Sequence, residues 1–345
     1  MVDWDVLLAH WSNHASVLAP PAPPPRPGFS GAGVWRVETT AGPLAVRSWP
    51  RPGLPRARID GLHRLLEEVS GTVPVAVPVV ANNHQRLIDW LGRFWQCEPW
   101  LPGVADFHDH PTEARLAAAL RSLAHFHHAA SRFTPNETTR EWFGQARSIP
   151  APAVGDHLER FDRLPDARWS ELVAKAQQQT DVGQAQLGLA RDLVDRADRL
   201  FRIVATPVRN QLAVMAHSLF DCHAALRDTW HDHVLFEGDE VTGIIDTGSC
   251  RLDTVAGDVA RLLGSLVGDD PVAWDRGLAA FQEIWPLRPH EIGLVTLLDQ
   301  SGTTLAAATW VERLASGQVP QHAVDRVLDR LNGIVGRLQS LADRI

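Results

Sequence analysis

The chain has 345 residues, of which 45% are apolar and 21% charged, and its net charge is −8. This length and composition indicate a folded protein with a sizeable core and more than one ordinary domain. They exclude an integral membrane protein, because no stretch approaches the roughly 18–20 uninterrupted apolar residues of a membrane helix. The acidic balance also argues against nucleic acid as a partner, since nucleic acid normally needs a basic face.

The three cysteines, Cys97, Cys222 and Cys250, form no CxxC pair. This excludes a disulfide scaffold and indicates a reducing compartment. The first residues include Asp3 and Asp5 and lack the basic and apolar regions of a secretory signal. We therefore expect a cytoplasmic protein.

Residues 1–98 have the pattern of a small α+β unit preceded by an N-terminal segment. Segment 1–27 combines an amphipathic helix with a proline-rich linker, in which proline favours extended backbone. From residue 28 the order β–β–α–β–β–β predicts a β-rich lobe that ends near residue 98. In chain order we expect a helix at 3–18, hairpin strands at 34–37 and 44–47, a helix at 56–68, and strands at 73–80, 86–89 and 93–98.

Residues 99–345 are mostly helical in pattern and contain one strand-rich stretch, at 226–246. Apolar residues recur at helical spacing on both sides of that stretch. We expect helices at 111–133, 159–178, 184–202, 208–225 and 254–266, with further helices up to residue 345. The predicted fold class is therefore α+β, with a small β-rich lobe and a larger, mostly helical lobe.

The chemically informative part of the chain is a predicted hairpin of strands 234–236 and 241–245 within segment 226–248. Asp228 and His233 precede its first strand, and Asp246 directly follows its second. Because a hairpin returns its ends to the same place, these three side chains should converge at one edge. Ionisable groups gathered in this way are costly unless they bind an ion or take part in chemistry.

This segment resembles the catalytic core of the aminoglycoside phosphotransferase and choline kinase group, the small-molecule branch of the protein-kinase-like fold. That group has H-G-D-x-x-x-x-N before the hairpin, D-F-G or I-D-x-G after it, and then a D-L-A helix. Here the corresponding segments are Leu226-Arg227-Asp228 with His233, then Ile245-Asp246-Thr247-Gly248, then Asp258-Val259-Ala260. Three motifs in the right order make the resemblance fairly specific.

The remainder of the chain agrees with the resemblance. Gly28 to Gly33 stands where a glycine-rich hairpin would cover the nucleotide phosphates, so the resemblance implies Ser30, Gly31 and Gly33 as nucleotide-binding residues. Residues 97–103 resemble the hinge between lobes, where Glu98 and Trp100 would lie beside the adenine.

The resemblance implies ATP-dependent phosphotransfer to a hydroxyl group of a small molecule. Asp228 would orient or deprotonate that hydroxyl, and Asp246 would hold the Mg²⁺ that bridges the nucleotide phosphates. Arg47 would neutralise the α- and β-phosphates in place of the usual lysine. The net charge is compatible with a cationic acceptor, and we expect neither a membrane nor nucleic acid as partner.

Two substitutions depart from the family's pattern. His233 replaces an asparagine that is the second metal ligand, and an imidazole nitrogen is a poorer ligand for Mg²⁺ than an amide oxygen. Either the metal site is weaker, or Mn²⁺ is tolerated better, or His233 binds no metal. Arg47 should also have a carboxylate partner on the 56–68 helix, where the candidates are Asp60, Glu67 and Glu68.

Two other functions stay open. A kinase-like protein that binds nucleotide without turnover is favoured by His233, by Leu226 in place of the motif's histidine, and by the lack of an obvious helix glutamate. A zinc-dependent hydrolase would rest on Asp221, Cys222, His223, His231 and His233. In that segment, however, we expect Cys222 and His223 to end a helix, which is poorly suited to a fixed ligand frame.

Overall fold

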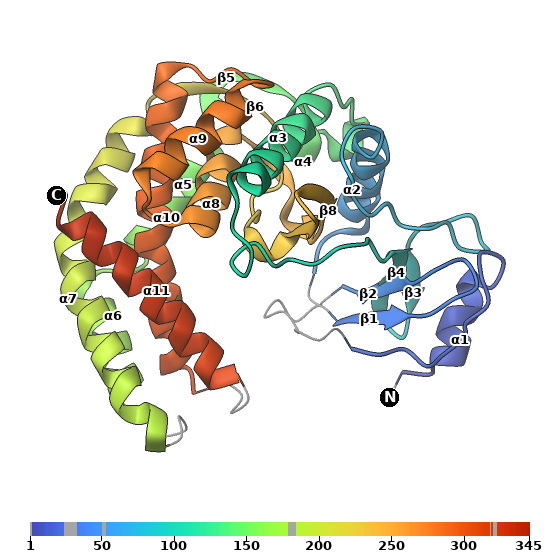
Figure 1. Cartoon of the computed structure of the whole chain (residues 1–345), viewed down its shortest axis with the longest axis horizontal. Coiled ribbons are helices and arrows are strands. Elements are labelled where there is room, and N and C mark those ends of the chain that lie inside the picture. The colour runs from blue at the N-terminus through green and yellow to red at the C-terminus, as the bar shows by residue number, and fades with distance from the viewer. Residues whose placement is uncertain (1, 24–32, 50–52, 179–183, 318, 320–322) are drawn as a thin grey trace. The chain divides into compact units, whose positions relative to one another are not determined.

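A computed structural model describes residues 2–23, 33–49, 53–178, 184–317, 319 and 323–345. The chain divides into two compact units (Figure 1). Unit 1 consists of Met1–Gln145, His223–Leu252 and Ala279–Trp285, and unit 2 of Ala146–Cys222, Asp253–Leu278 and Pro286–Ile345. The expected segments 1–27, 28–98 and 99–345 stay a proposal for how the chain divides by function.

Unit 1 contains a four-stranded antiparallel sheet in the order β1-β2-β4-β3. Its strands are β1 (Gly33–Val37), β2 (Leu44–Ser48), β3 (Ile88–Trp90) and β4 (Arg93–Pro99). The predicted first hairpin is confirmed, and Gly42 takes the positive φ of 105° that its turn requires. The strand predicted at 73–80 is wrong: this segment is irregular and makes one isolated bridge, from Val75 to Ile244.

The two faces of this sheet have different chemistry, because successive side chains of a strand point to opposite sides. Val46 of β2 and Trp95 of β4 face a core that is covered by α1 (Trp4–Leu8) and the short 3-10 helix Ala9–Trp11. The helix expected at 3–18 is therefore much shorter than predicted. The opposite face carries the polar side chains of Arg47, Gln96 and Glu98.

Helices cover the rest of unit 1. In α2 (Arg56–Val69), Ile59, Leu62 and Leu66 lie on one buried stripe, and the helix predicted at 56–68 is confirmed. In α3 (Glu113–Ala130), the Thr112 side chain caps the first turn by accepting from the Arg115 amide. The other elements of this part are the 3-10 helix Glu137–Thr139, α4 (Arg140–Phe143), the hairpin strands β7 (Val234–Glu237) and β8 (Glu240–Ile244), and the short helices His231–His233 and Thr247–Ser249.

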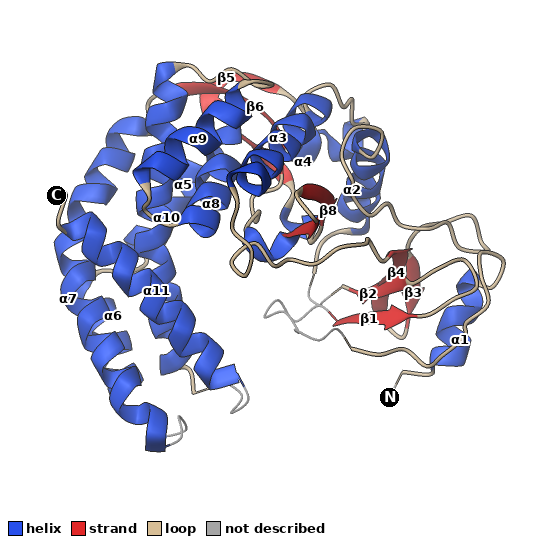
Figure 2. Cartoon of the chain, viewed as in Figure 1, coloured by secondary structure: helices blue, strands red, loops and turns tan. Residues whose placement is uncertain are grey.

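Unit 2 is almost entirely helical, as Figure 2 shows in blue. Helices α7, α10 and α11 pack against one another, and α6 packs on α7 and α10. Its helices are α5 (Pro152–Asp162), α6 (Asp166–Gln178), α7 (Gln184–Met215), α8 (Val255–Val267), α9 (Pro271–Gln282), α10 (Pro289–Ala315) and α11 (Val324–Ala342), of which α9 ends in unit 1. Strand β5 (Ala146–Pro150) pairs with β6 (Leu219–Ala225), and β9 spans Arg251–Asp253.

Three predicted helices of this part are corrected. The helix expected at 159–178 is two helices, α5 and α6. The helices expected at 184–202 and 208–225 are one helix, α7, which passes through Pro207 because its buried stripe continues from Val204 to Val208. Segment 219–225 is a strand, in which Phe220 and Cys222 are buried while Leu219 and Asp221 are exposed. Cys222 and His223 therefore lie on a strand and not at a helix end.

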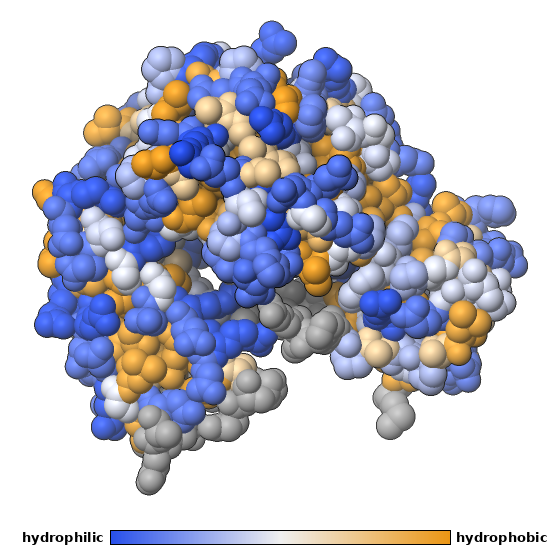
Figure 3. All heavy atoms as spheres, viewed as in Figure 1, coloured by the Kyte–Doolittle hydropathy of each residue, from blue (hydrophilic) through white to orange (hydrophobic). Residues whose placement is uncertain are grey.

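Hydrophilic side chains cover most of the face shown in Figure 3. Among the described residues, no helix has the length and apolar character needed to cross a lipid bilayer.

Candidate active site

The β7–β8 hairpin brings together the three ionisable residues predicted from the sequence. The imidazole of His233 links the other two, since its Nδ1 lies 2.7 Å from the backbone oxygen of Asp228. Its Nε2 lies 3.7 Å from Oδ2 of Asp246. The register of the β7–β8 hairpin causes this convergence, because it pairs Val234 with Ile244. His233 directly precedes Val234, and Asp246 follows Ile244 by two residues.

The backbone is unusual at both carboxylates. Arg227, directly before Asp228, has a φ of 65°, and Asp246 itself has a φ of 56°. Side chains other than glycine seldom adopt this left-handed region, and they do so where surrounding contacts impose it. Both segments therefore have a defined backbone conformation, one directly before Asp228 and the other at Asp246 itself.

The contacts of His233 fix its tautomer. The Asp228 carbonyl can only accept, so Nδ1 of His233 carries the proton and donates it. Nε2 then presents a lone pair, which accepts a hydrogen bond from the Trp230 indole at 2.8 Å. A metal ion could reach Nε2 only if Trp230 turned away. In this arrangement the imidazole orients the loop that carries Asp228.

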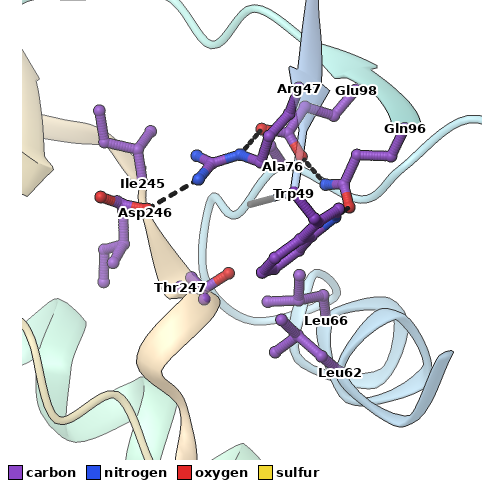
Figure 4. Close-up of a pocket in the computed structure, with 12 residues that line it drawn as sticks. Arg47, Trp49, Leu62, Leu66, Ala76, Gln96, Glu98, Ile245, Asp246 and Thr247 are labelled. Atoms are coloured by element: carbon purple, nitrogen blue, oxygen red, sulfur yellow. Dashed lines mark hydrogen bonds and ion pairs between the residues drawn. The ribbon is translucent and has the colours of Figure 1, made fainter. Parts of the chain in front are cut away.

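Arg47 lies between two carboxylates on the polar face of the sheet (Figure 4). Its Nη1 donates to Oδ1 of Asp246 at 2.8 Å, and its Nε lies 3.7 Å from Oε1 of Glu98. Burial would lower the pKa of Arg47, but Glu98 and Asp246 outweigh this effect and raise it. Burial would likewise raise the pKa of Asp246, but the charge and the hydrogen bond of the Arg47 guanidinium lower it. Arg47 and Asp246 are therefore held as a charged pair.

The prediction that a carboxylate of the 56–68 helix pairs with Arg47 is wrong. Asp60 pairs with Arg56 at 3.4 Å, and Glu67 pairs with Arg86 at 2.8 Å. The structural partner is Glu98 of β4, because the register places Arg47 opposite Gln96, two residues before Glu98 and on the same face. Burial raises the pKa of Glu98, and Arg47 opposes that rise.

A pocket lies beside this pair. Its walls come from β2, α2, β4 and the end of β8, all within unit 1. The lining combines an ionic rim with apolar side chains below it: Arg47, Trp49, Leu62, Leu66, Ala76, Gln96, Glu98, Ile244, Ile245, Asp246, Thr247 and Gly248.

The other predicted nucleotide-binding residues are placed as follows. Ser30 and Gly31 lie outside the described residues, and Gly33 begins β1. Trp100 follows β4, where its amide donates to the carbonyl of Pro43 and the Arg36 guanidinium lies 5.2 Å from its ring centre.

The donor set limits what metal this site can hold. Within the described ranges, no group of three or more His, Cys, Asp or Glu side chains is arranged to hold a metal ion, so the zinc interpretation has no structural support. Asp246 by itself still fits Mg²⁺, which proteins commonly bind through one or two carboxylates together with substrate phosphates.

Sequence reasoning missed the residues that support this site. Trp230 orients His233, and Gln96 joins Trp49 and His63 to Glu98. Strand alternation could have placed Gln96 on the same face as Glu98. No local pattern identifies His63 as the helix residue that reaches the sheet.

Comparisons with known proteins agree with this geometry. A family model described as "Phosphotransferase enzyme family" matches residues 22–292. The comparison with curated protein sequences gave no match.

Several solved structures share the fold across nearly the whole chain. A spectinomycin phosphotransferase in complex with ADP and spectinomycin is 12% identical, with 99% of this chain and 97% of that chain covered and a TM-score of 0.61. An amicoumacin kinase in complex with AMP-PNP and Ca²⁺ is 12% identical, with 99% and 94% covered and a TM-score of 0.63. A microcompartment-associated aminopropanol kinase is 14% identical, with 98% and 95% covered and a TM-score of 0.55. These likenesses confirm the predicted α+β, protein-kinase-like fold class.

Proposed function

Because the chain belongs to the phosphotransferase enzyme family, we propose that it transfers the γ-phosphoryl group of ATP to a hydroxyl group of a small molecule. One observation carries the proposal. Arg47 and Asp246 come from segments 199 residues apart and meet as an ion pair at the rim of a pocket. A fixed cation beside a carboxylate is what binding of a metal-complexed polyphosphate requires.

In this proposal Arg47 contacts the nucleotide phosphates and Asp246 holds the divalent cation. A Mg²⁺ ion at this position would neutralise charge that develops on the phosphate oxygens. Without nucleotide, Arg47 and Asp246 neutralise each other. When ATP and its metal bind, this ion pair is replaced by two others, Arg47 with the phosphates and Asp246 with the cation. Glu98 keeps Arg47 in place during this exchange, because it holds the guanidinium at a different nitrogen from Asp246.

Asp228 acts on the acceptor. Its carboxylate takes the hydroxyl proton while the acceptor oxygen forms a bond to the γ-phosphorus. The bond between that phosphorus and the β–γ bridging oxygen breaks, and ADP leaves with the bridging oxygen. His233 orients the loop through the Asp228 carbonyl, so we propose it as a positioning residue and not as a metal ligand. With His233 in this role, the proposal gives no reason to expect the better tolerance of Mn²⁺ that a histidine ligand would bring.

Structural relatives support the choice of donor and acceptor class. The two solved structures with nucleotides contain ADP and AMP-PNP, and the three relatives are named for small-molecule substrates or products. The net charge of −8 favours an acceptor that carries an amine.

Replacement of the proposed base tests the function. Asp228→Asn should lower ATP-dependent phosphorylation of hydroxyl compounds by about 10²–10⁴-fold, because general base catalysis contributes on that order. Affinity for ATP should be retained. The assay follows ADP release with a panel of amino alcohols and amino sugars, and product mass identifies the phosphorylated acceptor.

Asp232→Asn is the matched control, since Asp232 lies on the same loop and is 3.5 Å from His231. We expect it to keep turnover. Full turnover by Asp228→Asn would contradict the assigned role. ATP binding by the wild type without transfer to any acceptor would favour the non-catalytic nucleotide binder, which Leu226 and His233 first suggested.

A further inference from the structure

Two hydrogen bonds and an ion pair on the polar face of the sheet connect helix α2 to Arg47. Nε2 of His63 on α2 lies 3.0 Å from Oε1 of Gln96, and Nε2 of Gln96 donates to Glu98 at 2.6 Å. Glu98 in turn holds Arg47. Figure 4 shows the links from Gln96 through Glu98 to Arg47, together with the contacts of Gln96 to Trp49 and of Arg47 to Asp246.

The chemistry of the partners allows only one orientation of the Gln96 amide. The indole nitrogen of Trp49 is a donor only, and it lies 2.7 Å from the same Oε1 of Gln96. That atom must therefore be the oxygen, so the amide NH₂ points toward the carboxylate of Glu98. Two donors on one side and an acceptor on the other hold the amide against rotation.

The same logic defines the state of His63. Since Gln96 presents its oxygen, Nε2 of His63 must carry the proton and donate. Its Nδ1 is buried and makes no hydrogen bond to any described residue. A proton on Nδ1 would be buried without an acceptor, so His63 is neutral. The link between α2 and the sheet is therefore made by an uncharged donor, where the sequence predicted a carboxylate.

We propose that His63 is a positioning residue for Arg47, acting through Gln96 and Glu98. This proposal rests on the proposed function, in which Arg47 contacts the nucleotide phosphates. Without the His63 donor, Gln96 keeps only the Trp49 bond and its amide can tilt away from Glu98. Glu98 then loses a hydrogen bond, and the guanidinium of Arg47 is held less firmly at the pocket rim. The effect should appear in nucleotide affinity and not in the chemical step.

Calorimetric titration with ATP in the presence of Mg²⁺ tests the proposal on the full chain. His63→Leu removes the donor and should raise the dissociation constant for ATP roughly 3- to 10-fold, the range that one hydrogen bond supports. His63→Gln places an amide N–H near the position of Nε2 and should restore affinity to within about twofold of wild type. Val69→Ala is the control for packing, because Val69 is fully buried on α2 and lies outside the pocket lining.

The outcomes distinguish the positioning role of His63 from the proposed phosphotransferase function. Weaker ATP binding by His63→Leu, with His63→Gln and Val69→Ala near wild type, supports the positioning role. If His63→Leu and Val69→Ala lose ATP affinity equally, His63 acts only through packing and the positioning role is wrong. If Arg47→Ala abolishes binding while His63→Leu binds as wild type does, the positioning role falls and the proposed function stands. If wild type binds no ATP, the proposed function falls and the role of His63 falls with it.

Discussion

Single residues determine the charge state of this site. Arg47 has two carboxylate neighbours and Asp246 has two cationic or polar ones, so both stay ionised although the surroundings disfavour charge. The sequence predicts Asp228 and Asp246 because each belongs to a motif, and Arg47 because the resembled family has a phosphate-contacting basic residue near this position. It does not predict that Glu98 pairs with Arg47, because that contact depends on strand register and not on spacing along the chain.

Buried histidines should make the stability of the protein depend on pH. Burial lowers the pKa of His63 to about 4 and that of His223 to about 3, against about 6.5 in the unfolded chain. The unfolded state therefore binds more protons below pH 6.5, and stability falls as the pH falls from there toward each folded pKa. For His63 this loss amounts to roughly 3 kcal/mol by pH 4.

Urea unfolding between pH 7 and pH 4 measures this dependence. His63→Gln should make the profile less steep in that window, because glutamine does not titrate, while His223 still contributes to the slope. His14→Gln, at an exposed position, should leave the profile unchanged. A His63→Gln profile as steep as that of wild type would mean that His63 is protonated in the folded protein.

At the scale of elements, the site depends on short segments packed against the β7–β8 hairpin. After β4 the chain passes over this hairpin, where Val104 bridges Phe236 and the Thr242 hydroxyl donates to the Pro102 carbonyl at 2.8 Å. Gly103 has a φ of 88°, and a Cβ there would lie 2.7 Å from the Phe236 oxygen. The segment can follow this path only because residue 103 has no side chain.

Alanine substitutions at Gly103 and Gly42 measure how much the close contact at residue 103 costs in free energy of unfolding. Gly42 also has a positive φ, of 105°, but a Cβ there would meet no atom within 4 Å. Gly42→Ala should therefore cost about 1–2 kcal/mol of backbone strain. Gly103→Ala should cost about 1–3 kcal/mol more, because the neighbouring backbone must also shift. Equal losses in the free energy of unfolding would show that the contact with Phe236 relaxes without cost.

Elements with strong local periodicity could be predicted from the sequence. The continuity of α7 and the pairing of β6 could not. The first hairpin, α2 and the β7–β8 hairpin follow from alternation and apolar spacing, and their bounds agree to within a few residues. The sequence predicts separate helices at 184–202 and 208–225, but the apolar stripe on both sides of Pro207 keeps α7 continuous. The local pattern predicts a helix that reaches residue 225, but segment 219–225 pairs with β5, and no local pattern reveals such a non-local contact.

On the scale of the whole molecule, strand and helix patterns predicted the α+β class, and three motifs in order around one predicted hairpin predicted the protein-kinase-like fold. Their order in the chain reflects a topology shared with proteins of 12–14% identity. Identity of the acceptor does not follow from those motifs, because the roles proposed for them concern phosphate and metal. The acceptor is therefore the part of the function that experiment must supply.

Thermal unfolding with and without ATP, in the presence of Mg²⁺, tests the proposed phosphotransferase site most directly. ATP at about a hundred times its dissociation constant should add roughly 2.7 kcal/mol, which raises the Tm by a few degrees for a protein of this size. The shift should need Mg²⁺, should disappear in Asp246→Ala, and should persist in Asp60→Ala, whose carboxylate pairs with Arg56 outside the site. A Tm that ATP does not change, or an equal shift in Asp246→Ala, would contradict the assignment of this site.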